Sequence, residues 1–177
     1  MAQGVAALTD NMNKRIQSPL KKPVQLREVR ESDLPIFFEQ QLDPSANSMA
    51  AFTVKDPSDR QAFTAHWNKI LGDEGIMIKT ILFEGEVAGS ILSHGWYGEP
   101  EVSYWLGIEF WSKGIATEAL AAFLDHIKRR PLYARAAKDN IASVRVLEKC
   151  GFTICGYDRG FANARGEEIE EVILKLG

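Results

Sequence analysis

The stretch EFWSKGIATEALAAFL, residues 109–124, joins a small polar turn to the start of an apolar helix. The first amides of a helix have no carbonyl partners within it, and the helix dipole adds partial positive charge there. Such a helix end suits an anion, and best of all a phosphate. Gly114 has no Cβ, so a ligand can come close to the backbone. These features predict a phosphate-binding helix start at residues 112–117, with close helix–sheet packing as the plainer alternative.

A second stretch, NIASVRVLEKCGF at residues 140–152, is typical of another helix. Asn140 is placed to cap it, Ser143 lies in its first turn, and Gly151 is placed to end it. His94 is a further candidate for chemistry, because an unperturbed imidazole can act as a base near neutral pH. The two common nucleotide loops, GxxxxGK[ST] and GxGxxG after a first strand, are absent from the sequence.

The overall composition excludes several functional classes. The 177 residues include 21 basic and 24 acidic side chains, for a formal net charge of -3, so nucleic acid is not an expected partner. Cys150 and Cys155 have no CxxC or zinc spacing, which argues against a metal site and for a reducing compartment. No apolar run is long enough to span a membrane, and the first ten residues do not resemble a secretory signal. We therefore expect a cytoplasmic protein that has no membrane partner.

The elements that must position these residues follow from hydrophobic periodicity. An N-terminal extension, residues 1–23, precedes one domain over residues 24–177. Residues 43–51 are expected to form a loop, and the Glu84-Gly85 pair predicts a hairpin within an antiparallel meander. The expected strands cover residues 24–30, 76–83, 87–96, 101–108, 132–137, 152–161 and 167–176, and the expected helices cover 32–42, 58–72, 114–130 and 140–151. The order β-α-α-β-β-β-α-β-α-β-β predicts an α/β (α+β) fold, a mixed sheet with helices on its faces.

The segments VSYWLGIEFWSKGIATEAL and NIASVRVLEKCGF together resemble the two core motifs of the GNAT superfamily of acetyl-CoA-dependent N-acetyltransferases. The match is closest to the branch of Rim-type, ribosomal-protein N-terminal acetyltransferases. The resemblance covers residues 24–177 and agrees with the element order. It implies a GNAT-like acyl-CoA N-acyltransferase fold.

The resemblance also implies a set of cofactor contacts. In the family, a loop reading Gln/Arg-x-x-Gly-x-Gly/Ala wraps the CoA pyrophosphate with its amides, and Gly114 and Ala116 match it. Trp111 departs from the usual Gln or Arg, and Ser112 stands where a glycine is common. The preceding strand matches the segment that pairs with the pantetheine arm, and Asn140 matches an asparagine that contacts this arm. Acetyl-CoA is thus the expected co-substrate, with no metal, and the implied contacts are Tyr104, Trp105, Leu106, Ser112, Lys113, Gly114, Ile115, Ala116, Thr117 and Asn140.

Amine acetylation needs a base for the amine and an acid for the departing thiolate. Many relatives place a tyrosine as the acid where this sequence has Leu147. Ser143 matches a Rim-type serine that can hydrogen-bond the sulfur, with a local helix bond as an equal alternative. Glu101 matches an acidic residue frequent at this strand and could act as the base through water; a solvated carboxylate is the alternative, and His94 is the second candidate.

The expected function is transfer of an acetyl group from acetyl-CoA to a primary amine, directly in a ternary complex. The acceptor is a peptide N-terminus or a small-molecule amine, and residues 47–54, Trp67, Trp96 and Tyr97 could line its site or serve only in packing. Two rival predictions are a non-catalytic acyl-CoA-binding sensor or interaction module, and an unrelated α+β protein that does not bind CoA. A homodimer is a possible assembly, because dimerisation through edge strands is common in the family.

Overall fold

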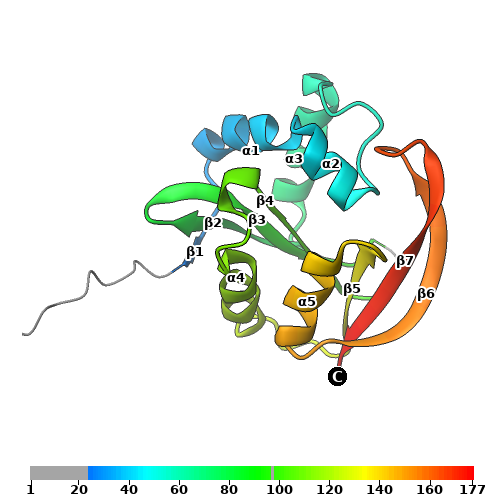
Figure 1. The fold of residues 1–177 in the computed structure, drawn as a ribbon. Helices are drawn as coiled ribbons and strands as arrows, with labels where there is room; N and C mark the ends of the chain where they lie inside the picture. The colour runs from blue at the N-terminus through cyan, green and yellow to red at the C-terminus, as the bar shows by residue number, and fades with distance from the viewer. Residues whose placement is uncertain (1–23, 97) are drawn as a thin grey trace, which may run out of the picture.

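The structure is a computed structural model that describes residues 24–96 and 98–177, so the predicted extension and Tyr97 lie outside the described residues (Figure 1). Within that part, one mixed sheet has seven strands in the order β1-β2-β3-β4-β5-β7-β6. The strands are β1 (Gln25–Arg27), β2 (Met77–Phe83), β3 (Glu86–His94), β4 (Glu101–Leu106), β5 (Leu132–Ala137), β6 (Thr153–Ala162) and β7 (Glu167–Leu176). The predicted fold class, a mixed sheet with helices on its faces, is confirmed.

The middle of the sheet is the predicted antiparallel meander, in which β2 pairs with β3 and β3 pairs with β4. Glu84 and Gly85 connect the first pair with φ angles of 54° and 87°. Positive φ at both central residues gives a hairpin turn whose twist matches that of the strands, which explains the glycine. At the other end of the sheet, β7 lies between β5 and β6 and is antiparallel to both.

Strands β4 and β5 are parallel, and their register contains one pair, Glu101 opposite Tyr133. Beyond Glu101 the two strands part. Within the described residues, the edge of β4 that faces β5 therefore has no strand partner from Val102 onward. An open strand edge of this kind can receive another extended chain through its amide and carbonyl groups.

In the described part of the chain, α-helices cover both faces of the sheet (Figure 1). They are α1 (Leu34–Gln41), α2 (Pro44–Ala50) and α3 (Arg60–Gly72) on the first face, and α4 (Ile115–Leu124) and α5 (Ile141–Lys149) on the second. The main core, beneath α4 and α5, contains Phe123 and Leu147. A smaller aromatic core beneath α1 and α3 contains Phe37, whose ring stacks on that of Trp67 at 4.9 Å.

Asp33 anchors the N-terminal end of the domain to the sheet. Its carboxylate, which is 1% exposed, accepts hydrogen bonds from Arg27, the Arg30 amide and the Thr80 hydroxyl. Burial opposes the charged form of Asp33, but these hydrogen bonds and the guanidinium charge outweigh it and lower its pKa to about 2. The Asp33 carboxylate therefore serves a long-range contact, and it makes no side-chain cap on α1.

Two of the predicted elements differ from the structure. Residues 43–51 do not form a loop throughout, because Pro44–Ala50 is the helix α2; Asp43 caps it through the Ala46 amide, and Pro44 is at its first turn. The helix predicted over residues 114–130 ends as α4 at Leu124. The amides that follow bond three residues back, and the side chains of Lys128 and Arg130 bond backbone carbonyls in this segment, so the chain leaves the helix before Pro131.

Candidate active site

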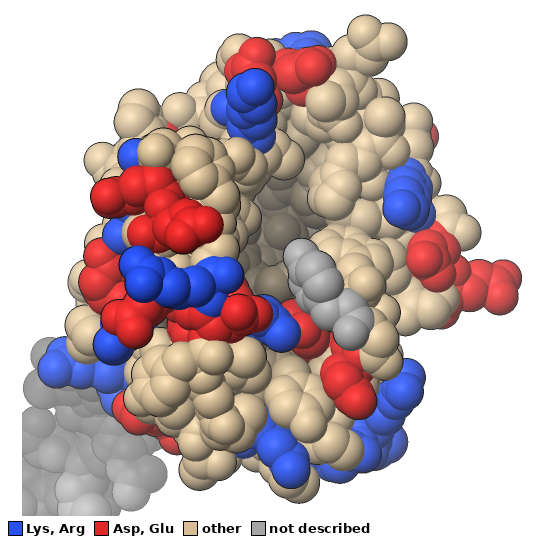
Figure 2. Space-filling view, turned by 90° about the vertical axis from the view of Figure 1, so that its right-hand side faces the viewer, with Lys and Arg blue, Asp and Glu red and all other residues tan. Residues whose placement is uncertain are grey.

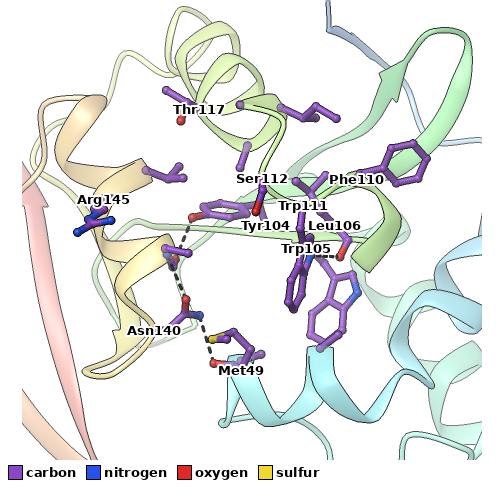
Figure 3. A pocket seen from close by; sticks show the side chains of 18 of the residues that line it. Met49, Tyr104, Trp105, Leu106, Phe110, Trp111, Ser112, Thr117, Asn140 and Arg145 are labelled. Atoms are coloured by element: carbon purple, nitrogen blue, oxygen red, sulfur yellow. Dashed lines mark hydrogen bonds between the residues drawn. The ribbon is translucent and has the colours of Figure 1, made fainter.

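A cavity of about 440 Å³ lies along β4 at residues 104–106, beyond the point where β4 and β5 part (Figure 3). Its walls come from α2, β4, the loop after β4, and the first turns of α4 and α5. The lining residues are Ala46, Met49, Ala50, Tyr104, Trp105, Leu106, Phe110, Trp111, Ser112, Gly114, Ile115, Ala116, Thr117, Asn140, Ala142, Ser143, Arg145, Val146 and Lys149. The structure thus brings both sequence motifs to one cavity, although they are far apart along the chain.

The start of α4 opens into this cavity without a side-chain cap. In α2, α3 and α5, an Asp or Asn side chain accepts a hydrogen bond from an amide of the first turn. In α4 the cap position is Gly114, with φ 78° and no side-chain acceptor. The first intrahelical bond at this end runs from the Glu118 amide to the Gly114 carbonyl. The amides of Ile115, Ala116 and Thr117 therefore remain available to an anion in the cavity.

The loop before α4 has a backbone that few side chains favour. Ser112 has φ 59°, and this left-handed conformation costs about 1 kcal/mol for a residue with a Cβ. The structure thereby explains why a glycine is common at this position in the family. Trp111, the residue before Ser112, donates its indole N–H to the Leu106 carbonyl over 3.0 Å. This bond ties the loop, which contains the 3-10 turn Ile108–Phe110, back onto the end of β4.

The charge of the cavity lining suits a polyanion. Arg145 and Lys149 are basic, and no lining residue among those described is acidic. Sequence reasoning missed both residues, although their spacing of four places them on one face of α5. Lys113, in contrast, was predicted to contact the cofactor but does not line the cavity; its ammonium lies 5.7 Å from the centre of the Phe110 ring.

Asn140 and Ser143 belong to the start of α5, which faces the cavity. The Asn140 side chain accepts a bond from the Ser143 amide and donates one to the Met49 carbonyl, so it caps α5 and links it to α2. The hydroxyls of Ser143 and Tyr104 lie 2.9 Å apart (Figure 3). The predicted alternative of a local helix bond for the Ser143 hydroxyl is therefore replaced by a contact across the gap.

Glu101 lies where β4 and β5 still pair and is 5% exposed. It is therefore not the solvated carboxylate of the alternative prediction, and it does not line the cavity. Arg135 on β5 donates from Nε to Glu101 over 3.2 Å and from Nη1 to Glu171 over 3.0 Å. Asp158 is a third carboxylate near this guanidinium, at 3.3 Å. Burial raises the pKa of Glu171, and the bond from Arg135 opposes that rise.

His94, the second candidate for the base, lies directly opposite Glu101 in the β3–β4 register. It is buried, its ring stacks on Trp96 at 3.9 Å, and burial lowers its pKa to about 4. His94 is therefore a weak base at neutral pH. Trp96 is 45% exposed and also lies near His66, at 6.0 Å between ring centres. Trp67 is separate from them, since it belongs to the core beneath α1 and α3.

The two remaining candidate residues, Cys150 and Leu147, do not line the cavity. Burial raises the pKa of the Cys150 thiol, which lies near the Thr117 carbonyl and packs against the main core. Leu147 is 1% exposed in that core and presents no polar group.

In the described part of the chain, no group of three or more His, Cys, Asp or Glu side chains could hold a metal ion. No helix in that part is long and apolar enough to cross a bilayer.

Several solved structures share this fold at low sequence identity. RimJ of Mycobacterium smegmatis, in complex with CoA-disulfide, is 23% identical with a TM-score of 0.72, and the match covers 86% of this chain and 81% of that one. A ribosomal-protein-alanine N-acetyltransferase from Brucella melitensis is 21% identical with a TM-score of 0.68, covering 86% and 98%. A spermidine N-acetyltransferase from Vibrio cholerae, in complex with CoA and spermine, is 16% identical with a TM-score of 0.71, covering 86% and 94%.

The sequence itself matches a family model described as an acetyltransferase (GNAT) domain over residues 24–153. Comparison with curated protein sequences finds no match. The matched region includes every residue that lines the cavity and both sequence motifs. The rival prediction of an unrelated α+β protein is therefore wrong, and the predicted resemblance is confirmed. The chain belongs to the GNAT family of acetyltransferases.

Proposed function

We propose that this protein transfers the acetyl group of acetyl-CoA to a primary amine, which attacks the thioester directly in a ternary complex. The observation that carries the proposal is the cavity along β4, beyond the point where β4 and β5 part. It joins the uncapped start of α4 to the open edge of β4 and to the Ser143 hydroxyl. Each of these features suits a different part of acetyl-CoA.

The described residues fit this co-substrate. The amides of residues 115–117 would hold the pyrophosphate, and the loop at Ser112 and Gly114 would give it access to the backbone. Arg145 and Lys149 add positive charge for the phosphates. The open edge of β4 from Tyr104 to Leu106 would pair with the amides of the pantetheine arm as a neighbouring strand does. When bound, acetyl-CoA supplies the activated acyl group.

The acid and base candidates lie on opposite faces of β4. Side chains alternate along a strand, so Glu101 and Trp105 point to one face and Tyr104 to the other, where α5 presents Ser143. Glu101 is about 10 Å along the strand from Tyr104. We assign Glu101 the role of base, acting on the amine through water, and Ser143 or water the role of proton donor to the thiolate. The amine thus loses one proton to the base and the sulfur gains one from the donor, and exchange with solvent returns both groups to their starting protonation states.

The acceptor is proposed to be a small-molecule amine or a peptide N-terminus. The fold neighbours include enzymes named for spermidine and for ribosomal protein, so both kinds of acceptor are compatible with this fold. Trp96 is exposed next to buried His94, and Met49 and Ala50 of α2 line the cavity from the Trp105 side of the sheet. Figure 2 shows a hollow with charged residues on its rim, on the side that carries β6 and β7 in Figure 1. We propose that the acceptor enters from that side.

The test is a turnover assay over a panel of amines. The purified protein is incubated with acetyl-CoA and with spermidine, small primary amines or peptides that differ in their first residue. We expect time-dependent release of free thiol together with an acetylated product identified by mass spectrometry. Binding of acetyl-CoA without turnover of any acceptor would favour the non-catalytic sensor instead. Cytoplasmic location and a homodimer stay predictions from the sequence.

A further inference from the structure

Tyr104 and Ser143 face each other across the gap between β4 and α5. Tyr104 comes from the open strand, and Ser143 comes from the first turn of the helix 39 positions later. Their hydroxyl oxygens are 2.9 Å apart, and both side chains line the cavity (Figure 3). This is a direct contact between the strand and the helix that flank the proposed path of the pantetheine arm.

The hydrogen bond leaves one hydroxyl hydrogen for a ligand. A hydroxyl has one hydrogen and two acceptor lone pairs, so only one of the two groups can donate to the other. A phenol is a stronger acid than an aliphatic alcohol and is therefore the better donor. With Tyr104 as donor, the Ser143 hydrogen is left to point into the cavity. The other polar group of Ser143 at this end, its amide, is already bonded to Asn140.

We propose that Tyr104 is a positioning residue, which donates its phenolic hydrogen to Ser143 and so turns the Ser143 hydroxyl hydrogen toward the sulfur of the cofactor. This inference rests on the proposed function of the cavity. In the reaction, the bond from the amine nitrogen to the acyl carbon forms and the carbon–sulfur bond breaks. Ser143 stabilises the departing thiolate through its hydrogen bond, the sulfur gains one proton from Ser143 or water, and the proton lost by the amine to the base balances it. Tyr104 stays neutral throughout.

The surroundings of Tyr104 favour this role. Burial raises the pKa of Tyr104 to about 12, although the bond with Ser143 opposes the rise, so the phenol keeps its hydrogen at neutral pH. Leu147, one helical turn after Ser143, is buried in the core and cannot supply a hydroxyl. Tyr104 is therefore the group that orients Ser143 from across the gap.

Kinetics of Tyr104→Phe, Ser143→Ala and the double variant test the inference. We expect Ser143→Ala to lower kcat by about 30-fold and Tyr104→Phe by about tenfold, since hydrogen bonds to charged groups are typically this strong. The KM for acetyl-CoA should change less than about twofold. Because Tyr104 acts through Ser143, the double variant should be no slower than Ser143→Ala alone. Wild-type kcat in Tyr104→Phe, or losses that multiply in the double variant, would overturn the inference.

Calorimetry gives a readout that does not depend on turnover. Wild-type protein should bind CoA several-fold more tightly than desulfo-CoA, and this preference should vanish in Ser143→Ala and weaken in Tyr104→Phe. An unchanged preference in Tyr104→Phe contradicts the inference. Tyr157→Phe is the matched control, because Tyr157 is 61% exposed and does not line the cavity. If the wild type binds neither acetyl-CoA nor CoA, the proposed function fails, whereas normal binding with no effect of Tyr104→Phe removes only the present inference.

Discussion

Glu101 and Arg135 form a buried ion pair where β4 and β5 begin to part, with Arg135 Nε 3.2 Å from Glu101 Oε1. The pair joins the two strands at the closed end of the gap, and Glu171 and Asp158 complete the surroundings of the guanidinium. Glu101 is thus a structural partner of Arg135 besides its proposed role as the base.

Glu101→Gln should separate these two roles. The substitution keeps the shape of the side chain and removes the charge, while Arg135 keeps Glu171 and Asp158 as partners. We expect kcat to fall about 100-fold, a typical loss for a general base, with little change in the KM for acetyl-CoA. Glu171→Gln is the control, because it also removes a partner of Arg135 but no proposed base. Equal losses in the two variants would reduce Glu101 to a structural residue.

Gly114→Ala tests the start of α4 as the pyrophosphate site. A Cβ at this position meets no atom within 4 Å, but φ 78° is unfavourable for alanine, so the loop should shift. We expect stability to fall by about 1 kcal/mol and the affinity for acetyl-CoA, measured by calorimetry, to fall about tenfold. The control is Gly166→Ala, because Gly166 has φ 69° in the β6–β7 turn and a Cβ there also meets no atom within 4 Å. This variant should lose as much stability as Gly114→Ala and keep the wild-type affinity for acetyl-CoA. Equal affinities for the two variants would argue against this site.

Arg145→Gln and Lys149→Gln test the basic side of the cavity. Both side chains are exposed, so each charge should contribute modestly, and we expect acetyl-CoA to bind about two- to fivefold more weakly in each variant. The loss should shrink as salt rises, because salt screens exposed charges. Arg129→Gln removes an exposed charge outside the cavity and serves as the control. An effect of equal size in Arg129→Gln would mean that only net charge matters.

The low pKa of Asp33 predicts how the free energy of unfolding depends on pH. Its pKa is about 2 in the folded protein against an ordinary value of 3.8, so the folded state favours the carboxylate. The contribution to stability is therefore fully present above about pH 4 and is lost as the pH falls through 2; its size is about 2 kcal/mol. Urea unfolding from pH 2 to pH 6 should show this loss in the wild type. Asp33→Asn should be less stable at neutral pH and lose less on acidification, and parallel curves for the two proteins would contradict the assignment.

Local sequence patterns predicted most of the fold. The meander, the Glu84-Gly85 hairpin and the starts of α4 and α5 follow from alternation, helical period and turn residues, all of which act over a few neighbours. The end of α4 at Leu124 did not follow from them. The same is true of the start of α4, where Gly114 and the absence of a capping side chain are visible in the sequence. The helix α2 was missed because its composition of small and polar residues is also typical of loops.

The sequence by itself determined the family, the two motifs and the type of ligand that the start of α4 suits. Only the tertiary structure decided which side chains meet at the cavity. It placed Tyr104 against Ser143, directed Arg145 and Lys149 to the same cavity, and buried Glu101 against Arg135. These contacts join residues far apart in the chain, and they depend on where β4 and β5 separate. That separation is a relationship between two strands about 30 residues apart in the chain, which no local pattern of residues encodes.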